Sequence, residues 1–108
     1  MVINDVKSLL GLTGSTADNQ LNTIINIVGA RIRNRLEGIE EIPEELEYII
    51  TEVTVARYNQ IGSEGTSSHT VVQESMSWAD DLLAPYMDDL QDYLTRQETA
   101  RRGRLRFL

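Results

Sequence analysis

The only histidine of this 108-residue chain, His69, follows Ser67 and Ser68, and a serine beside an imidazole is a combination used in nucleophilic catalysis. Such catalysis needs a base that a third group orients across a folded site, and adjacent residues of one loop do not provide this geometry. The chain has no cysteine and no second histidine that could share a metal ion with His69. The sequence therefore predicts no catalytic, cofactor-binding or metal-binding residue, and we expect that the protein is not an enzyme.

Carboxylates form the second chemically distinctive group, and they gather at the beginnings of predicted helices. Negative charge near a helix N-terminus is stabilised by the helix dipole, so helix capping and a solvated face are favoured over a cation site. The carboxylates are Glu40, Glu41, Glu44, Glu45 and Glu47 in one group and Asp80, Asp81, Asp88, Asp89 and Asp92 in the other.

Formal charge is distributed unevenly along the chain. The net charge is −7 at pH 7, but residues 96–108 hold five arginines against one glutamate, so residues 1–95 carry −11. Because DNA affinity comes largely from cationic side chains that displace counterions from phosphates, the acidic body argues against ordinary DNA binding. The basic C-terminal end alone is suited to an acidic partner.

Apolar residues that recur every three or four positions predict four helices, over residues 2–10, 15–37, 43–62 and 80–97. Ser15 or Thr16 is expected to cap the second helix, Gly38 to end it, and Pro43 to begin the third. Asp80 or Asp81 is expected to cap the last helix. The expected core positions are Val6, Leu21, Ile24, Ile25, Val28, Ile32, Leu36, Leu46, Ile49, Ile50, Val53, Ala56, Leu82, Leu83, Tyr86, Met87, Leu90, Tyr93 and Leu94.

Two segments lack a helical period. Residues 62–79 are small, polar and β-favouring, which predicts a long extended loop or weak hairpin between the third and fourth helices. Loops of this length tend to be functional. In it, Trp78 with Met76 is interpreted either as an apolar plug of the core or as a recognition element.

Residues 98–108 are predicted to form an extended, basic C-terminal tail. In it Leu105 and Phe107 alternate with arginines, a period-two pattern suited to adding a strand to a partner's sheet, although a frayed terminus is the alternative. The predicted architecture is therefore all-α: a small bundle of about four helices in residues 1–97, with the loop at 62–79 and an extended tail at 98–108.

In this order, a short helix, two longer ones, a serine-rich loop, a final helix and a basic tail, the chain resembles the head-to-tail connector proteins of tailed bacteriophages. These are also called head completion or adaptor proteins. The resemblance covers nearly the whole chain and is carried by ARYNQIGSEGTSS (residues 56–68), APYMDDLQDYL (residues 84–94) and RRGRLRFL (residues 101–108).

The resemblance implies a subunit of a dodecameric ring that binds the phage portal protein on one side and the next head-completion or tail protein on the other. DNA would pass non-specifically through the centre. It implies a protein at the head-tail interface of the virion, assembled in the host cytoplasm, with no catalytic residue or cofactor. The N-terminus lacks the pattern of a signal peptide, and no run of about 18 apolar residues suggests a membrane partner.

The resemblance also implies roles for two sets of residues. A loop that reaches a neighbouring subunit or lines the channel would comprise Ser63, Glu64, Ser67, Val71, Val72, Met76 and Trp78. A tail that docks on the portal would comprise Arg101, Arg102, Arg104, Leu105, Arg106, Phe107 and Leu108.

Physical reasoning from the residues leads to a ring by another route. A ring needs a heterologous interface, in which one patch on each copy meets a different patch on the next. The third predicted helix is apolar on more than one side, so Tyr48, Val55 and Tyr58 are candidates for a face toward another subunit. Carboxylates facing the lumen would repel DNA phosphates and let the DNA pass.

Two other functions fit the sequence less well. A small helical DNA-binding regulator would have to read DNA with the second helix, through Arg31, Arg33 and Arg35, because the third begins with glutamates. Another phage tail-completion protein would share the pattern of helices, and its partner rather than its sequence would distinguish it.

Overall fold

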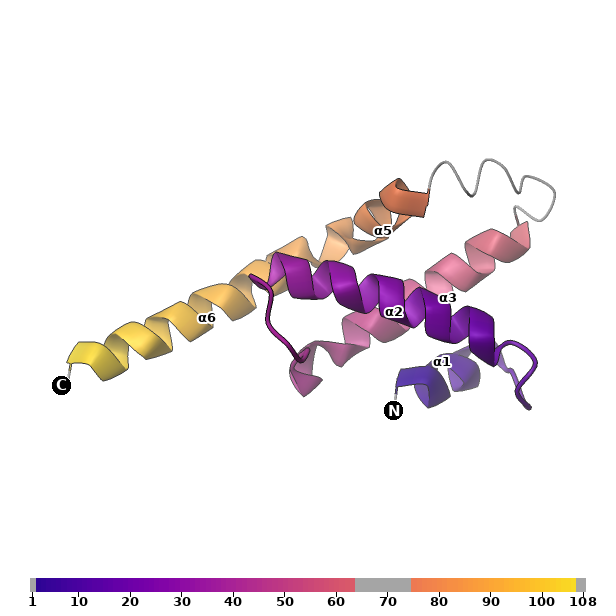
Figure 1. Ribbon diagram of the computed structural model, residues 1–108, viewed down its shortest axis with the longest axis horizontal. Coiled ribbons are helices and arrows are strands. Elements are labelled where there is room, and N and C mark those ends of the chain that lie inside the picture. The colour runs from indigo at the N-terminus through magenta and orange to yellow at the C-terminus, as the bar shows by residue number, and fades with distance from the viewer. Residues whose placement is uncertain (1, 64–74, 107–108) are drawn as a thin grey trace.

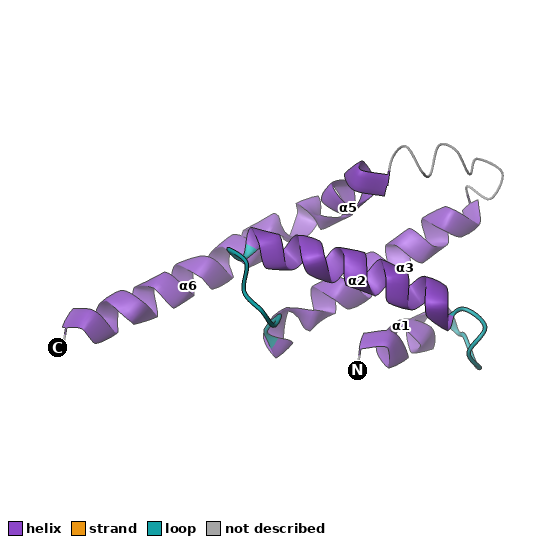
Figure 2. Cartoon of the chain, viewed as in Figure 1, coloured by secondary structure: helices purple, strands orange, loops and turns teal. Residues whose placement is uncertain are grey.

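The computed structural model describes residues 2–63 and 75–106, and every regular element in these ranges is a helix (Figures 1 and 2). The predicted all-α bundle of about four helices is therefore confirmed. In chain order the elements are α1 (Val2–Leu10), α2 (Asp18–Arg35), the 3₁₀ turn η1 (Glu44–Leu46), α3 (Glu47–Ser63), α5 (Ser75–Leu83), the 3₁₀ turn η2 (Ala84–Tyr86) and α6 (Met87–Arg106).

Helix α3 is the central element, because α1, α2 and α5 all pack against it. This explains why its apolar residues lie on more than one side: different sides of α3 are covered by different helices of the same chain. The expected core positions are largely confirmed, and the side chains below a tenth exposed are Val6, Leu21, Ile24, Val28, Ile32, Leu36, Leu46, Ile49, Ile50, Val53, Trp78, Ala79, Leu83 and Leu90.

Helix α2 ends as expected, in a left-handed turn at Gly38. The Gly38 N–H donates to the Arg33 carbonyl at 2.8 Å and the Glu37 N–H donates to the Asn34 carbonyl at 3.3 Å, which is the Schellman pattern of bonds. Glu37 and Gly38 both have positive φ, 65° and 79°. A glutamate thus occupies a backbone conformation that glycine adopts with less strain.

The start of α2 differs from the expectation. The N-cap is Ala17 rather than Ser15 or Thr16, and no side chain caps the helix. Instead, the first-turn residue Asp18 pairs with Lys7 of α1, with 2.9 Å between Nζ and Oδ1. Because this carboxylate lies in the first turn, it stabilises the positive end of the helix and also joins α2 to α1.

The predicted loop is shorter than expected, because α5 begins at Ser75. The alternation of Met76 and Trp78 with serines therefore does not indicate a strand. Trp78 is 7% exposed and belongs to the core, and the Arg57 guanidinium carbon lies 4.6 Å from its ring centroid. Burial of Trp78 with Ala79 and Leu83 on one helix face explains why this segment folds as a helix.

Asp80 likewise does not cap the last helix. Its Oδ1 atom lies 3.7 Å from Nη1 of Arg31 and 3.5 Å from Nη2 of Arg35, so it pairs α5 with α2. The 3₁₀ turn η2 carries Pro85 between α5 and α6, where the missing proline N–H is tolerated at the start of a new helical turn.

Helix α6 continues through Arg106, so residues 98–106 are helical rather than strand-like, and no break occurs at residue 97. Arginines near a helix C-terminus are favoured by the dipole, and arginine, glutamine and leucine are good helix formers. From Thr95 to Ala100 every side chain is exposed, and Figure 1 shows this part of α6 projecting beyond the bundle. Phe107 and Leu108 lie outside the described residues.

Two glycines allow a matched pair of substitutions that tests the backbone conformation of α2 and of the turn that ends it. A Cβ at Gly29 would lie 3.5 Å from Ile42 Cδ1 and 3.6 Å from Arg33 Nη1, which are ordinary contact distances. Because glycine costs about 0.8–1 kcal/mol relative to alanine inside a helix, we expect Gly29→Ala to raise the free energy of unfolding by about 0.5–1 kcal/mol. Urea denaturation followed by circular dichroism measures the change.

The control is Gly38→Ala, which has open space around the new Cβ but a φ of +79°. Since an L-residue in this conformation costs roughly 1–2 kcal/mol, this variant should be destabilised by about 1 kcal/mol. A loss of stability in Gly29→Ala would contradict the packing of α2 against Ile42 described above.

Candidate assembly surface

Two tyrosines and two carboxylates join α3 to the start of α6 in a crossed arrangement. The Tyr48 hydroxyl of α3 donates to Oδ2 of Asp89 in α6, and the Tyr86 hydroxyl of η2 donates to Oε1 of Glu52 in α3 at 2.8 Å. The two rings meet edge to face, with centroids 6.3 Å apart and planes at 70°. We call these four residues the tyrosine clamp.

The local sequence places each pair of the clamp on one helix face. Tyr48 and Glu52 are one turn apart on α3, while Tyr86 and Asp89 are three residues apart, and both spacings put side chains on the same side. Each element therefore offers one donor and one acceptor to the other. The clamp fixes the direction in which α6 leaves the bundle.

Both phenols are held in the neutral form. The hydrogen bond to Asp89, with burial and the charges of Asp89 and Glu52, raises the pKa of Tyr48 to about 12. Burial, followed by the hydrogen bond to Glu52, raises the pKa of Tyr86 to about 12. In both tyrosines an ionised hydroxyl could no longer donate its hydrogen bond, and its negative charge would face that of a carboxylate.

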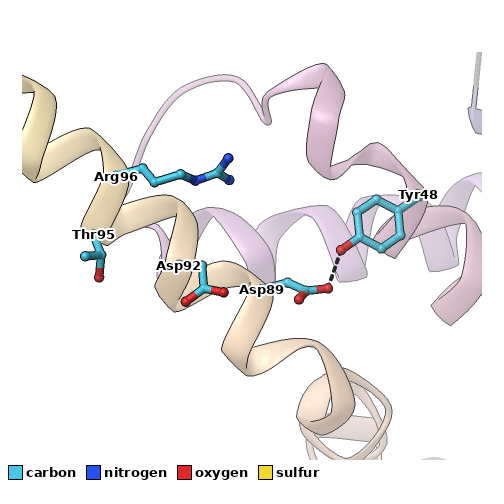
Figure 3. Close-up of a pocket in the computed structure, with 5 residues that line it drawn as sticks. All are labelled: Tyr48, Asp89, Asp92, Thr95 and Arg96. Carbon is cyan, nitrogen blue, oxygen red and sulfur yellow. Dashed lines mark hydrogen bonds between the residues drawn. The ribbon is translucent and has the colours of Figure 1, made fainter.

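Tyr48 also lies between two open pockets. One, of about 470 Å³, is lined by Tyr48, Asp89, Asp92, Thr95 and Arg96 along α6. Figure 3 shows the two aspartates on successive turns of α6, with the Arg96 side chain reaching in the direction of Tyr48.

The second pocket, of about 390 Å³, lies where α1 meets the start of α3. Two large side chains are exposed there, the aliphatic Leu9 at 66% and the aromatic Tyr48 at 41%. The residues that line it are Asp5, Leu9, Glu44, Glu47, Tyr48, Thr51 and Glu52. The two pockets share Tyr48, and we call them together the acidic groove.

The structure places the predicted residues of α3 in different environments. Tyr48 is exposed at the acidic groove, Val55 is half-buried, and Tyr58 packs against the core, so Tyr48 has the most surface free for a partner. A role of these three residues in contacts between subunits stays a prediction.

The predicted loop and tail residues are placed only in part. Ser63 ends α3, Met76 lies in α5, and Trp78 is buried in the core. Glu64, Ser67, Val71 and Val72 lie outside the described residues. Of the predicted tail, Arg101, Arg102, Arg104, Leu105 and Arg106 form the last turns of α6.

Sequence reasoning did not single out Leu9, Glu52 or Asp89 as members of a site. The sequence offered a signal for Leu9, because Leu9 and Leu10 are adjacent in a helix with one apolar stripe and both cannot face the core. Glu52 and Asp89 resemble ordinary residues of a solvated face until the tyrosines of the other helix are placed beside them.

Two of the three arginines that a DNA-reading second helix would need are paired with a carboxylate of α5. Arg31 and Arg35 both lie within 4 Å of the Asp80 carboxylate. An arginine paired with a carboxylate must give up that pair before it can neutralise a phosphate. This arrangement weighs against the interpretation as a DNA-binding regulator.

Residues 2–63 and 75–106 contain neither a cluster of metal ligands nor a membrane-spanning helix. Within these ranges, no three acidic, histidine or cysteine side chains are grouped so that they could hold a metal ion. None of the helices there is both long and apolar enough to cross a membrane.

The raised pKa values predict a loss of stability at alkaline pH. Below pH 10 both phenols are protonated in the folded and unfolded chain, and the stabilisation is fully present. As the pH rises from 10.0 to about 12, the unfolded chain ionises first, so the free energy of unfolding should fall. Urea denaturation at a series of pH values measures this fall.

The double variant Tyr48→Phe, Tyr86→Phe should lose stability at neutral pH and should show a smaller alkaline fall than the native chain. Tyr93→Phe, outside the clamp, serves as the control for removing a phenol. An alkaline fall of the same size in the double variant would show that the clamp does not form in solution.

Comparison with known proteins adds a separate observation. Residues 1–93 match the family of phage gp6-like head-tail connector proteins, a stretch that includes α1, α2, α3, α5 and the start of α6. No curated protein and no solved structure matches the chain. The match covers most of the chain and includes every residue of the tyrosine clamp. The chain thus belongs to the phage gp6-like head-tail connector family, whose members are structural proteins and not enzymes.

Proposed function

We propose that this protein forms the ring that joins the portal of a phage head to the next head-completion or tail protein. The family match over residues 1–93 carries the proposal, because a head-tail connector is a virion component that assembles with other virion proteins. The proposal adds a dodecameric ring at the head-tail interface, a central passage for DNA and docking on the portal.

The shape of the subunit supports a ring. The molecule is elongated, with extents of 59 × 30 × 20 Å, and α6 projects from one end of the bundle (Figure 1). A projecting helix can contact a neighbour without rearrangement of the core. Surface around Tyr48 on α3 and the segment 62–79 are the proposed contacts between subunits or with the channel.

Energetics favour a ring that closes on a template. A patch of several hundred Å² buried against each neighbour contributes roughly 25 cal/mol for each Å², while association costs about 4–15 kcal/mol. Much of the helix α3 surface is already covered within the subunit, so little apolar surface remains to offset that cost. The isolated protein is therefore monomeric or weakly associated, and the ring forms on the portal.

The charge of the body suits a DNA passage. Residues 1–95 carry −11, and carboxylates on the lumen would repel phosphates, so that DNA slides rather than binds. Electron microscopy of the protein mixed with its portal tests the assembly directly. Rings on the portal with an open centre are expected, and a tight dodecamer of the pure protein at nanomolar concentration would contradict the role of the template.

The C-terminal end is the proposed portal-docking segment, with residues 98–108 forming a unit separate in function from residues 1–97. Deletion of residues 101–108 should abolish attachment to the portal while the bundle stays folded. Among the residues whose burial the structure describes, Leu94 is the last that packs against the core, and residues 95–100 are exposed. Co-sedimentation with portal rings measures attachment, and circular dichroism measures folding.

A variant that keeps the composition of residues 101–108 but scrambles their order is the matched control. It separates attachment that depends on the sequence of the segment from attachment that depends on its charge alone. Attachment of the truncated protein at the native level would contradict the assignment of this segment to the portal.

A further inference from the structure

We propose that the acidic groove of one subunit receives the arginine-bearing end of α6 from the next copy of this chain. This inference rests on the proposed function, since it supplies the contact by which the ring closes. It gives the helical turns with Arg101, Arg102 and Arg104 a contact with the neighbouring subunit in addition to the portal docking proposed above for the whole segment.

The groove has the composition of a binding surface for a cationic helix. Leu9 and Tyr48 expose apolar surface in it, and its charged lining consists of six carboxylates and one cation, Arg96. Among the described residues, neither Asp5, Glu44 nor Glu47 forms an ion pair or side-chain hydrogen bond, so these charges are available to a partner. The carboxylates around the groove are Asp5, Glu44, Glu47, Glu52, Asp89 and Asp92.

The complementary charge is found on the same chain. Residues 96–108 carry +4, and four of their five arginines fall at or after residue 101. Helix α6 continues through Arg106, so most of this charge lies on a helix that projects from the bundle (Figure 1). The ten residues from Gln97 to Arg106 span about 15 Å at 1.5 Å per residue, so the basic end of the helix can reach a neighbouring subunit.

The basic end of α6, residues 97–106, which we call the arm, cannot fill the groove of its own subunit. The residues of α6 that line the groove extend from Asp89 to Arg96, and the helix continues from there away from the bundle. Its basic end therefore lies at the far end of a helix whose beginning lines the groove. Because arm and groove are different patches, the contact is heterologous, and repeated contacts of this kind close a ring when the rotation allows it.

Charge reversal provides the test, using the full-length protein and sedimentation velocity. The native protein should associate weakly at low salt and dissociate as the ionic strength rises from about 0.05 M to about 0.5 M, where charges are screened within about 5 Å. Two variants each reverse one side of the contact. The groove variant is Asp5→Lys, Glu44→Lys, and the arm variant is Arg101→Glu, Arg102→Glu.

Each variant alone should lose at least tenfold in association, because like charges then face each other. An equimolar mixture of the two should regain it, since the groove of each copy then meets an arm of opposite charge. The control variant Glu40→Lys, Glu41→Lys changes the net charge by the same amount at exposed positions outside the groove, and it should associate at least as well as the native protein. Circular dichroism verifies that all variants are folded.

Recovery of association in the mixture supports the contact between arm and groove. The absence of recovery, or association of both single variants at the native level, overturns it. The milder pair Asp5→Asn, Glu44→Gln replaces the groove variant if that variant does not fold. Portal attachment is measured in parallel and separates this inference from the proposed function. If the groove variant self-associates at the native level but no longer attaches to the portal, the groove binds the portal and the inference is overturned. If the native protein itself does not attach to the portal, the proposed function is contradicted.

Discussion

The packing of apolar side chains on several sides of α3 is the interaction on which the rest of the structure depends. With no cysteine in the chain, neither disulfides nor thiolate metal sites can replace it. Helices α1, α2 and α5 each cover part of α3, and the tyrosine clamp joins η2 and α6 to α3 through one hydroxyl–carboxylate hydrogen bond each. Since α3 is occupied in this way, the subunit is left with edges and a projecting arm, rather than one broad apolar face, for contacts with other proteins.

Charge is segregated in the same molecule. Carboxylates stand at the starts of α3 and α6, where the helix dipole favours them, and arginines stand at the end of α6, where the dipole favours the opposite sign. One set of local preferences thus stabilises the helices and also places opposite charges in different parts of the subunit. A connector that must assemble in order, and only beside its proper neighbours, benefits from contacts that depend on orientation.

Much of this fold was predictable from the sequence, because α1, α2 and α3 follow a period of three to four residues and end near glycines. The beginning of α5 was not, because Ser75 to Trp78 alternate as in a strand, whereas the backbone there is helical and Trp78 is buried in the core. The site was less predictable still. Tyr48 was a candidate on its helix, but its partner Asp89 is 41 residues away in the sequence, and Glu52, the partner of Tyr86, is 34 residues away. These pairs form only when the tertiary structure brings the helices together.

Trp78 is the only tryptophan of the chain and is buried on α5 beside the Arg57 guanidinium. Its indole therefore lies where α5 packs against α3, and its fluorescence emission spectrum reports on this one contact without added dye. A shift of that emission to longer wavelength would reveal water reaching the indole. The chain thus contains an intrinsic optical probe that can distinguish loosening of α5 from the core from changes at the distant arm.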